Sequence, residues 1–353
     1  MKISEKELID KAEDAVRACL ENIPFIKILE IRRYRESVHL HPDLWIKLGM
    51  PYGEQDIIAE VKSNGEPRSV REAANQLLKF RYAAPPGTYG ILVAPFVSSR
   101  GAEICAQEKI GHVDLSGNCS LSFGHIYIER RGNPNLFAQK RNLRSLYSPR
   151  AERVLRVLLS NPHEFWNLQK LADEAEVSLG QVSNVKRMLS DREWIEPEHG
   201  RIRLIKPIEL LSEWAANYDF KRNEVRDFYT LKDPYEFEAD LAEWCAKNET
   251  QYAFTGFSGA ARLAPAVRYQ RTMAYVSRPP SIIATLMNLK EVPGGANVRL
   301  LIPYDKGVYY GMKAVNTVWA SSPIQTYLDL CSIKGRGEEA AQVILDEVIK
   351  PLW

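Results

Sequence analysis

The sequence lacks any long run of apolar residues. Although 45% of its 353 residues are hydrophobic, none of its apolar stretches approaches the roughly 20 residues that span a bilayer. The charged start, from Met1 to Glu7, is followed by no apolar signal core. We therefore expect a cytoplasmic protein with no membrane partner.

Cysteine is also scarce, and the few cysteines are scattered. There are five, an odd number, and no two of them have the sequence spacing of a metal site. They are Cys19, Cys105, Cys119, Cys245 and Cys331. This pattern predicts buried, reduced thiols in a reducing compartment rather than a disulfide framework.

Acidic residues are nearly missing between Arg130 and Arg156. This stretch has eight basic residues and one acid, Glu152, a surplus of seven positive charges, whereas the whole chain has a net charge of only +2. The basic residues are Arg130, Arg131, Lys140, Arg141, Arg144, Arg150, Arg153 and Arg156. A charged run is usually a solvated surface, but one that leads into a DNA-binding motif predicts contact with nucleic acid.

The chain is too long for one ordinary core, and its patterns predict an α/β multidomain protein. We expect a domain at 1–132, a basic linker at 133–149, a helical segment at 150–207 and a second α/β domain at 208–353. In the first domain we expect helices at 4–22, 69–83 and 98–109 and strands at 26–34, 43–48, 56–63, 91–94, 119–123 and 125–129. In the last we expect strands at 251–254, 272–277, 298–302 and 316–319 and helices at 235–247, 281–288 and 336–350.

The segment 150–207 has the spacing of three helices followed by a short hairpin. An amphipathic helix from Arg150 to Leu159 precedes a second helix at 167–175, which Asn167 caps. A turn at 176–178 buries Val177, and Ser178 caps a third helix that runs to about Arg192. A hairpin that turns at 199–200 follows. These features resemble the winged helix-turn-helix of bacterial transcriptional regulators over about 55 residues, including the small residue at Ala172.

The third helix has one apolar and one polar side. Val182, Val185 and Leu189 are expected to point inward, so the polar side is left for a DNA major groove, where amide and guanidinium groups read base edges. The wing arginines, with Lys206, are expected to bind phosphates. The expected DNA-binding residues are Ser178, Gln181, Ser183, Asn184, Lys186, Arg187, Arg201 and Arg203. The alternative is a dimerisation or docking module that does not bind DNA.

The first domain carries a second candidate site. Pro42-Asp43 precedes Glu60-Val61-Lys62, and Gln76 lies on the following helix. Glu60 and Lys62 are two apart on a strand and therefore share a face. Over residues 5–95 this pattern resembles the PD-(D/E)xK nuclease family, which implies catalytic roles for all four side chains. In that family two carboxylates, here Asp43 and Glu60, hold Mg²⁺.

One alternative to an active nuclease stays open for this domain. It is a nuclease-like scaffold without catalysis, in which Glu60 and Lys62 form only a surface ion pair. No glutamate of the first helix matches the family clearly, and Glu13 and Glu21 are the candidates for that position. The polar segment 114–118 is explained most simply as a tight turn.

Near the start of the last domain, the segment 255–261 follows a strand and contains Gly256 and Gly259. Such a turn can hold a phosphate and resembles the start of a nucleotidyltransferase domain. The strand at 272–277 has no carboxylate pair for metal, so we expect no such catalysis.

Together with the tail at 321–341 and the winged helix, this segment resembles the AbiEi-type antitoxins of type IV toxin–antitoxin systems over residues 148–353. The resemblance implies an operator-binding regulator that acts on double-stranded DNA. An alternative for the tail is plain packing by Ile324, Tyr327 and Leu328.

Three hypotheses follow. The first is an antitoxin-type regulator that needs no cofactor to bind DNA. The second is a Mg²⁺-dependent DNA endonuclease that the winged helix delivers to its site. The third is a nucleotide-binding interaction protein. The sequence leaves open the operator, a toxin partner and a homodimer.

Overall fold

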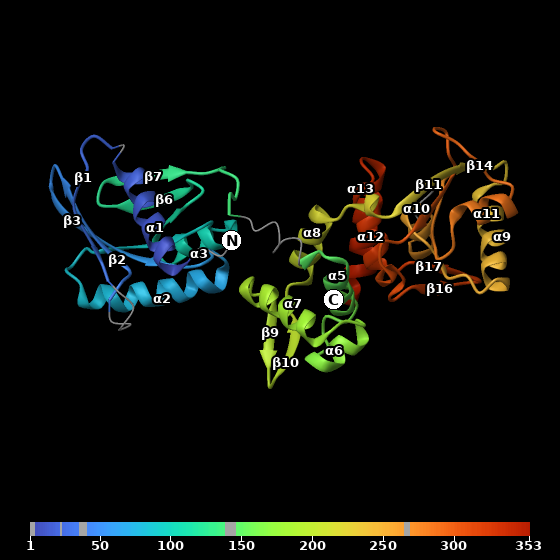
Figure 1. Cartoon of the computed structure of the whole chain (residues 1–353), viewed down its shortest axis with the longest axis horizontal. Helices are drawn as coiled ribbons and strands as arrows, with labels where there is room; N and C mark the ends of the chain where they lie inside the picture. Colours follow the sequence, from blue (N-terminus) through green and yellow to red (C-terminus); the bar gives the residue numbers. More distant parts are fainter. Residues whose placement is uncertain (1–3, 22, 35–40, 138–145, 265–268) are drawn as a thin grey trace. The chain divides into compact units, whose positions relative to one another are not determined.

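The computed structural model describes residues 4–21, 23–34, 41–137, 146–264 and 269–353. The chain divides into two compact units, which we describe separately (Figure 1). The first comprises residues 1–143 with 190–193, and the second comprises 144–189 with 194–353. Three β-sheets with surrounding helices make this a mixed α/β protein. Among the described residues, no helix is both long and apolar enough to cross a membrane.

The first unit is built on one seven-stranded sheet, whose strands lie side by side in chain order from β1 to β7. Its elements are α1 (Glu5–Leu20), β1 (Lys27–Arg33), β2 (Leu44–Met50), β3 (Gly53–Val61), α2 (Pro67–Ala83), β4 (Tyr89–Ala94), α3 (Ser99–Gln107), β5 (Gly111–Asp114), β6 (Cys119–Phe123) and β7 (Ile126–Arg130). β3, β4 and β5 run parallel, and the other neighbours are antiparallel.

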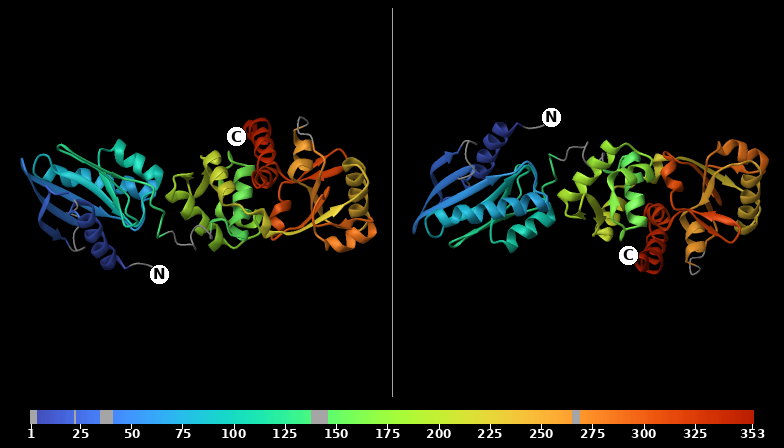
Figure 2. Two further views of the ribbon diagram at one scale, coloured as in Figure 1. Left: turned by 90° about the horizontal axis from the view of Figure 1, so that it is seen from above. Right: turned by 90° about the horizontal axis from the view of Figure 1, so that it is seen from below.

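Helices cover both faces of this sheet (Figure 2). The parallel strands are joined by α2 and α3, which pack on the same face, whereas α1 packs on the other. Alternation along β3 follows from this arrangement: Ile57 and Ala59 point towards α1, and Ile58 points towards α2 and α3.

Every helix and strand expected between residues 4 and 130 is present, but the sequence did not predict β5. This short strand, Gly111-His112-Val113-Asp114, has a single aliphatic side chain and hence no recognisable period, although all four residues are buried. The tight turn expected after it is confirmed, since the Asp114 carboxylate accepts hydrogen bonds of 2.9 Å from the amides of both Ser116 and Asn118.

The second unit begins with three helices and a small three-stranded sheet of order β8-β10-β9. These elements are α5 (Pro149–Ser160), β8 (Trp166–Asn167), α6 (Leu168–Glu174), α7 (Leu179–Asp191), β9 (Ile195–Glu198) and β10 (Arg201–Leu204), followed by α8 (Pro207–Asn217). The lengths and order are those expected of a winged helix-turn-helix.

A seven-stranded mixed sheet of order β14-β11-β15-β13-β12-β17-β16 forms the rest of this unit. Its strands are β11 (Glu224–Tyr229), β12 (Tyr252–Phe254), β13 (Thr272–Val276), β14 (Lys290–Glu291), β15 (Val298–Ile302), β16 (Lys313–Val315) and β17 (Val318–Ala320). The helices are α9 (Pro234–Lys247), α10 (Gly256–Leu263), α11 (Pro280–Leu286), α12 (Pro323–Cys331) and α13 (Arg336–Ile344). Short helical turns are η1 (Phe220–Arg222), η2 (Lys306–Tyr309), η3 (Leu345–Ile349) and η4 (Lys350–Leu352).

The sequence predicted four strands of this sheet and missed three, β11, β14 and β16. β11 was not predicted, because three of its six residues are charged and only Phe228 is fully buried. The strand expected at 316–319 is present as β17 (Val318–Ala320), but residues 316–317 form the turn of the hairpin between β16 and β17, where Asn316 has a φ of 56°.

A single apolar core joins helices α5 to α8 to the C-terminal sheet and its helices. It runs from Leu155 of α5 and Leu189 of α7 through Trp214 of α8 to Leu328 of α12 and Ile344 of α13. The second unit therefore behaves as one packed body.

The cysteines are free, as the sequence predicts. Four are buried and Cys331 is half-buried. Cys19 of α1 and Cys119 of β6 are neighbours in space, with their sulfur atoms 3.1 Å apart.

Candidate nucleic-acid interface and candidate metal site

Helix α7 has the inward face that the sequence predicts. The Ser178 hydroxyl caps it by accepting a hydrogen bond of 3.3 Å from the amide of Gln181. Val182, Val185 and Leu189 are fully buried. Their burial fixes the rotation of the helix and therefore which side chains face outward.

The outward face of α7 is polar and basic. Its exposed or half-exposed residues include every candidate that the sequence singled out on this helix: Ser178, Gln181, Ser183, Asn184, Lys186 and Arg187. Within α7 the one acidic residue is Asp191, the last of the helix. The surface therefore presents amide, hydroxyl and cationic groups, and the one carboxylate of the helix, Asp191, lies one turn after Arg187.

The helix before α7 and the turn between them set the position of α7. Asn167 caps α6, because its side chain accepts a hydrogen bond of 2.8 Å from the amide of Gln169. Ala172 is buried, which allows the two helices to approach closely. The turn passes through Glu176 with a φ of 49°, a left-handed conformation that is uncommon outside glycine.

The wing is the hairpin of β9 and β10, which turns through His199 and Gly200, both with positive φ. Arg201 is exposed at its tip. Arg203 is half-buried, with its guanidinium 2.6 Å from the Glu196 carboxylate and over the ring of Phe165. The structure thus places Arg201 where it can reach a ligand and uses Arg203 to hold the wing together.

The basic run expected to line the interface does not do so as a whole. Arg153 forms an ion pair of 2.8 Å with Asp305, and Arg156 is 1% exposed and donates to Gln325. Both arginines belong to the contact between α5 and the C-terminal sheet, so their expected part in a phosphate-binding surface is wrong. Lys140, Arg141 and Arg144 lie outside the described residues.

The four candidate residues of the first unit share the face of the sheet covered by α2. Leu44 follows Asp43 and points towards α1, so Asp43 lies on the opposite face. Leu44 pairs with Ala59, which sets Asp43 beside Glu60. The Asp43 carboxylate accepts a hydrogen bond of 2.7 Å from the amide of Val61.

Lys62 connects the strand to the helix. Its ammonium group lies 2.9 Å from the Glu60 carboxylate and donates a hydrogen bond to the side-chain oxygen of Gln76 on α2. Asp43, Glu60, Lys62 and Gln76 therefore lie close together. Glu13 and Glu21 of α1 are instead paired with arginines, Glu13 with both Arg17 and Arg33.

The electrostatics of this site favour an added cation. Burial, followed by the nearby charge of Asp43, raises the pKa of Glu60 to about 7, although the hydrogen bond and the charge of Lys62 act to lower it. Two hard oxygen donors that repel each other fit a divalent cation such as Mg²⁺, which typically takes one or two carboxylates and completes its shell with water or phosphate. Among the described residues no group of three or more acidic, histidine or cysteine side chains could hold a metal.

The segment at the start of α10 is packed and leaves no phosphate cradle. Thr255 and Ser258 are fully buried, and the Ser258 hydroxyl accepts a hydrogen bond of 3.0 Å from the amide of Met273. A Cβ on Gly256 would lie 2.6 Å from the Met273 sulfur. The glycines of this segment thus serve close packing.

The tail has the core face that the packing alternative predicts, since Ile324, Tyr327 and Leu328 are buried. It also holds a buried polar network that the sequence did not reveal. The Asp329 carboxylate accepts hydrogen bonds from the hydroxyls of Tyr218 and Tyr275, 2.8 and 2.9 Å away. Burial raises the pKa of Asp329. Its partners come from distant segments, so no local motif identifies it.

Comparison with known protein families concerns this second unit. Residues 203–350 match the family model described as "Transcriptional regulator, AbiEi antitoxin, Type IV TA system". The C-terminal half carries an AbiEi-type regulator domain. The AbiEi match covers the last two residues of β10, helix α8 and the whole C-terminal sheet, and it confirms the resemblance over these residues.

Comparison with individual proteins gives only weak similarities. No curated protein matches the chain. A structure of EndoMS in apo form is 18% identical over 29% of this chain and 45% of that chain, with a TM-score of 0.22. The structure of an EndoMS–dsDNA2 complex is 20% identical over 28% of this chain and 42% of that chain, with a TM-score of 0.21. Our chain thus covers less than half of either solved chain.

Proposed function

We propose that this chain is an antitoxin-type transcriptional regulator that binds operator DNA through α7 and the wing. The observation that carries the proposal is the outward face of α7, where Asn184, Lys186 and Arg187 stand on a helix whose apolar side is buried. The AbiEi match of the following residues supports the same function.

The side chains of α7 suit the edges of base pairs. An asparagine amide such as that of Asn184 can bond adenine at two atoms, and an arginine such as Arg187 can do the same with guanine. Arg201 on the wing and Lys170 of α6 line a pocket of about 580 Å³ together with Phe165. Cations at such a position hold the DNA backbone and fix the register without reading sequence.

The experiment is a titration of the full chain with labelled duplex DNA, taken from the region upstream of its own coding sequence and compared with a scrambled duplex. We expect tighter binding to the upstream duplex. If about six phosphates are neutralised, the slope of log K against log salt is near −5. A slope near zero on both duplexes would contradict the proposal.

A second function, metal-dependent DNA cleavage, is favoured by one specific observation: the convergence of Asp43, Glu60, Lys62 and Gln76 on one face of the sheet. Asp43 and Glu60 would hold the metal, which would supply an activated water and neutralise phosphate charge. Lys62 would stabilise the negative charge that develops on the phosphate. Gln76 would keep the Lys62 ammonium group aimed at the site.

This second function has its own test. Single-stranded, duplex and branched DNA are incubated with the full chain and Mg²⁺ or Mn²⁺, beside the Lys62→Ala variant. Cleavage that the variant lacks supports a nuclease. Intact DNA in every combination rejects the nuclease and leaves the regulator untouched.

A further inference from the structure

A charged contact links the C-terminal sheet to the turn that precedes α7. At its centre is Arg153 of α5, whose guanidinium donates two hydrogen bonds of 2.8 Å to the Asp305 carboxylate. Its remaining terminal nitrogen donates a hydrogen bond of 3.2 Å to the backbone carbonyl of Glu176. One side chain thus joins α5, the loop before η2 and the turn of the helix-turn-helix.

Asp305 fixes this guanidinium in place. Its own carboxylate also accepts a hydrogen bond of 2.7 Å from the amide of Gly307, so both partners of the pair are held. The side chains of Arg153 and Asp305 are only 18% and 8% exposed. A bidentate pair at this depth has a defined geometry, unlike a solvent-exposed ion pair.

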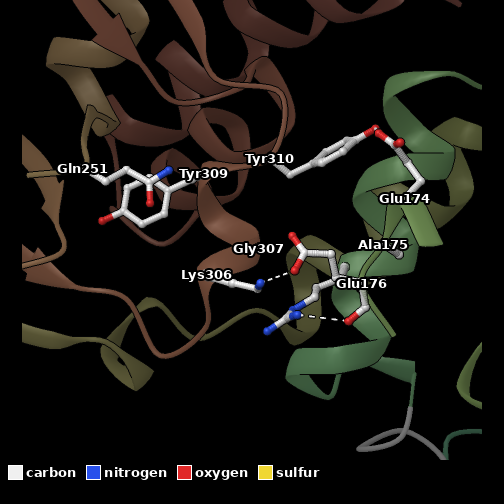
Figure 3. Close-up of a pocket in the computed structure, with 9 residues that line it drawn as sticks. Glu174, Ala175, Glu176, Gln251, Lys306, Gly307, Tyr309 and Tyr310 are labelled. Carbon is white, nitrogen blue, oxygen red and sulfur yellow. Dashed lines mark hydrogen bonds and ion pairs between the residues drawn. The ribbon is translucent and has the colours of Figure 1, made fainter. Parts of the chain in front are cut away.

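Two outer contacts repeat the link between the same two segments. Lys306 is paired with the Glu176 carboxylate, and the Tyr310 hydroxyl donates a hydrogen bond of 2.8 Å to Glu174 (Figure 3). These residues, with Arg153, line a pocket of about 350 Å³. On the helix-turn-helix side, these contacts are made by Glu174 at the end of α6 and by Glu176 in the turn. They do not involve the outward face of α7.

We propose that Asp305 and Arg153 are positioning residues for DNA binding: the C-terminal sheet, through this pair, fixes the turn at Glu176 and thereby the angle at which α7 meets the groove. The backbone of Glu176 needs stabilising contacts, because its φ of 49° is unfavourable for a residue with a side chain. The inference rests on the proposed regulator function. It assigns to the C-terminal domain an indirect part in DNA affinity, which acts through the turn at Glu176.

The test uses the full-length Asp305→Asn variant, which keeps the shape of the side chain and removes its charge. Its affinity for the upstream duplex should fall about tenfold, equivalent to roughly 1.4 kcal/mol. The slope of log K against log salt should remain that of the wild type, because no phosphate contact is lost. Asp305→Glu, which restores the carboxylate, should recover part of the affinity.

A matched control separates positioning from general stability. Asp227→Asn breaks another bidentate pair of the same unit, between Asp227 and Arg299, at 2.7 and 2.8 Å. We expect both variants to lower the melting temperature, but only Asp305→Asn to weaken DNA binding. Equal affinities of Asp305→Asn and wild type would overturn the inference while the regulator function stands. A wild type that binds no DNA would instead reject the proposed function itself.

Discussion

The carboxylate of Asp43 accepts a 2.7 Å hydrogen bond from the amide of Val61, the residue between Glu60 and Lys62. This bond ties the start of β2 to the end of β3. The carboxylates of Asp43 and Glu60 therefore lie side by side in a partly buried site. Their mutual repulsion is unfavourable unless a proton or a cation neutralises one of them.

Metal binding at this site can be measured without any assay of cleavage. We expect millimolar Mg²⁺ or Mn²⁺ to raise the melting temperature of the wild type, because a ligand that binds only the folded state stabilises it. Asp43→Asn should abolish the rise. Glu54→Gln, which removes an exposed carboxylate from the same strand β3, should preserve it. A rise that survives in Asp43→Asn would locate the metal elsewhere.

A separate prediction concerns the outward face of α7. Arg187→Ala should weaken binding of the upstream duplex by about 1–3 kcal/mol and reduce the preference over a scrambled duplex, because a base contact is lost. Lys290→Ala removes an exposed cation of β14 and serves as the control. Fluorescence anisotropy at fixed salt gives both affinities. If Arg187→Ala loses no more affinity than Lys290→Ala, α7 does not read the DNA.

The sequence predicted the buried face of α7 and the side that Glu60 and Lys62 share because both are recorded locally. A cap at Ser178 and the spacing of Val182, Val185 and Leu189 determine the face of a helix, and strand alternation determines that Glu60 and Lys62 share a side. Such patterns depend only on period and do not require knowledge of distant partners.

The part that could not be predicted depends on contacts between distant segments. Arg153 and Arg156 look like part of a basic surface in the sequence, yet their partners Asp305 and Gln325 lie about 150 residues or more further along the chain. Arg203 is paired within its own hairpin, with its cross-strand neighbour Glu196. Local charge counting cannot distinguish a solvated arginine from one that is paired on folding.

Gly307 makes the contact between the C-terminal loop and α5 sensitive to a single methyl group. A Cβ at this position would lie 2.9 Å from both the Arg153 side chain and the Asp305 carboxylate. Gly307→Ala should therefore destabilise the second unit by about 1–3 kcal/mol, the usual cost of overpacking. Gly294→Ala, where no atom lies within 4 Å, is the control. Urea unfolding of both variants measures the loss of stability. Equal midpoints would contradict the tight packing at Gly307.

The ion pair of Arg153 and Asp305 also predicts a pH dependence. Burial opposes ionisation of Asp305, but hydrogen bonds from the Arg153 guanidinium and the Gly307 amide outweigh it, so the pKa lies below the ordinary 3.8. A carboxyl group whose pKa is lowered by folding stabilises the protein above its unfolded pKa, and this contribution is lost as the pH falls through the folded value.

The free-energy difference between wild type and Asp305→Asn should therefore stay constant from about pH 8 to pH 5 and shrink only below about pH 4. Urea unfolding of the two proteins across this range measures it, and subtraction cancels the titration of all groups that they share. Asp227, whose pKa is also lowered, by the hydrogen bond from Arg299, provides a second pair for comparison. A difference that shrinks already between pH 7 and pH 5 would mean that Asp305 is not held as an ionised partner of Arg153.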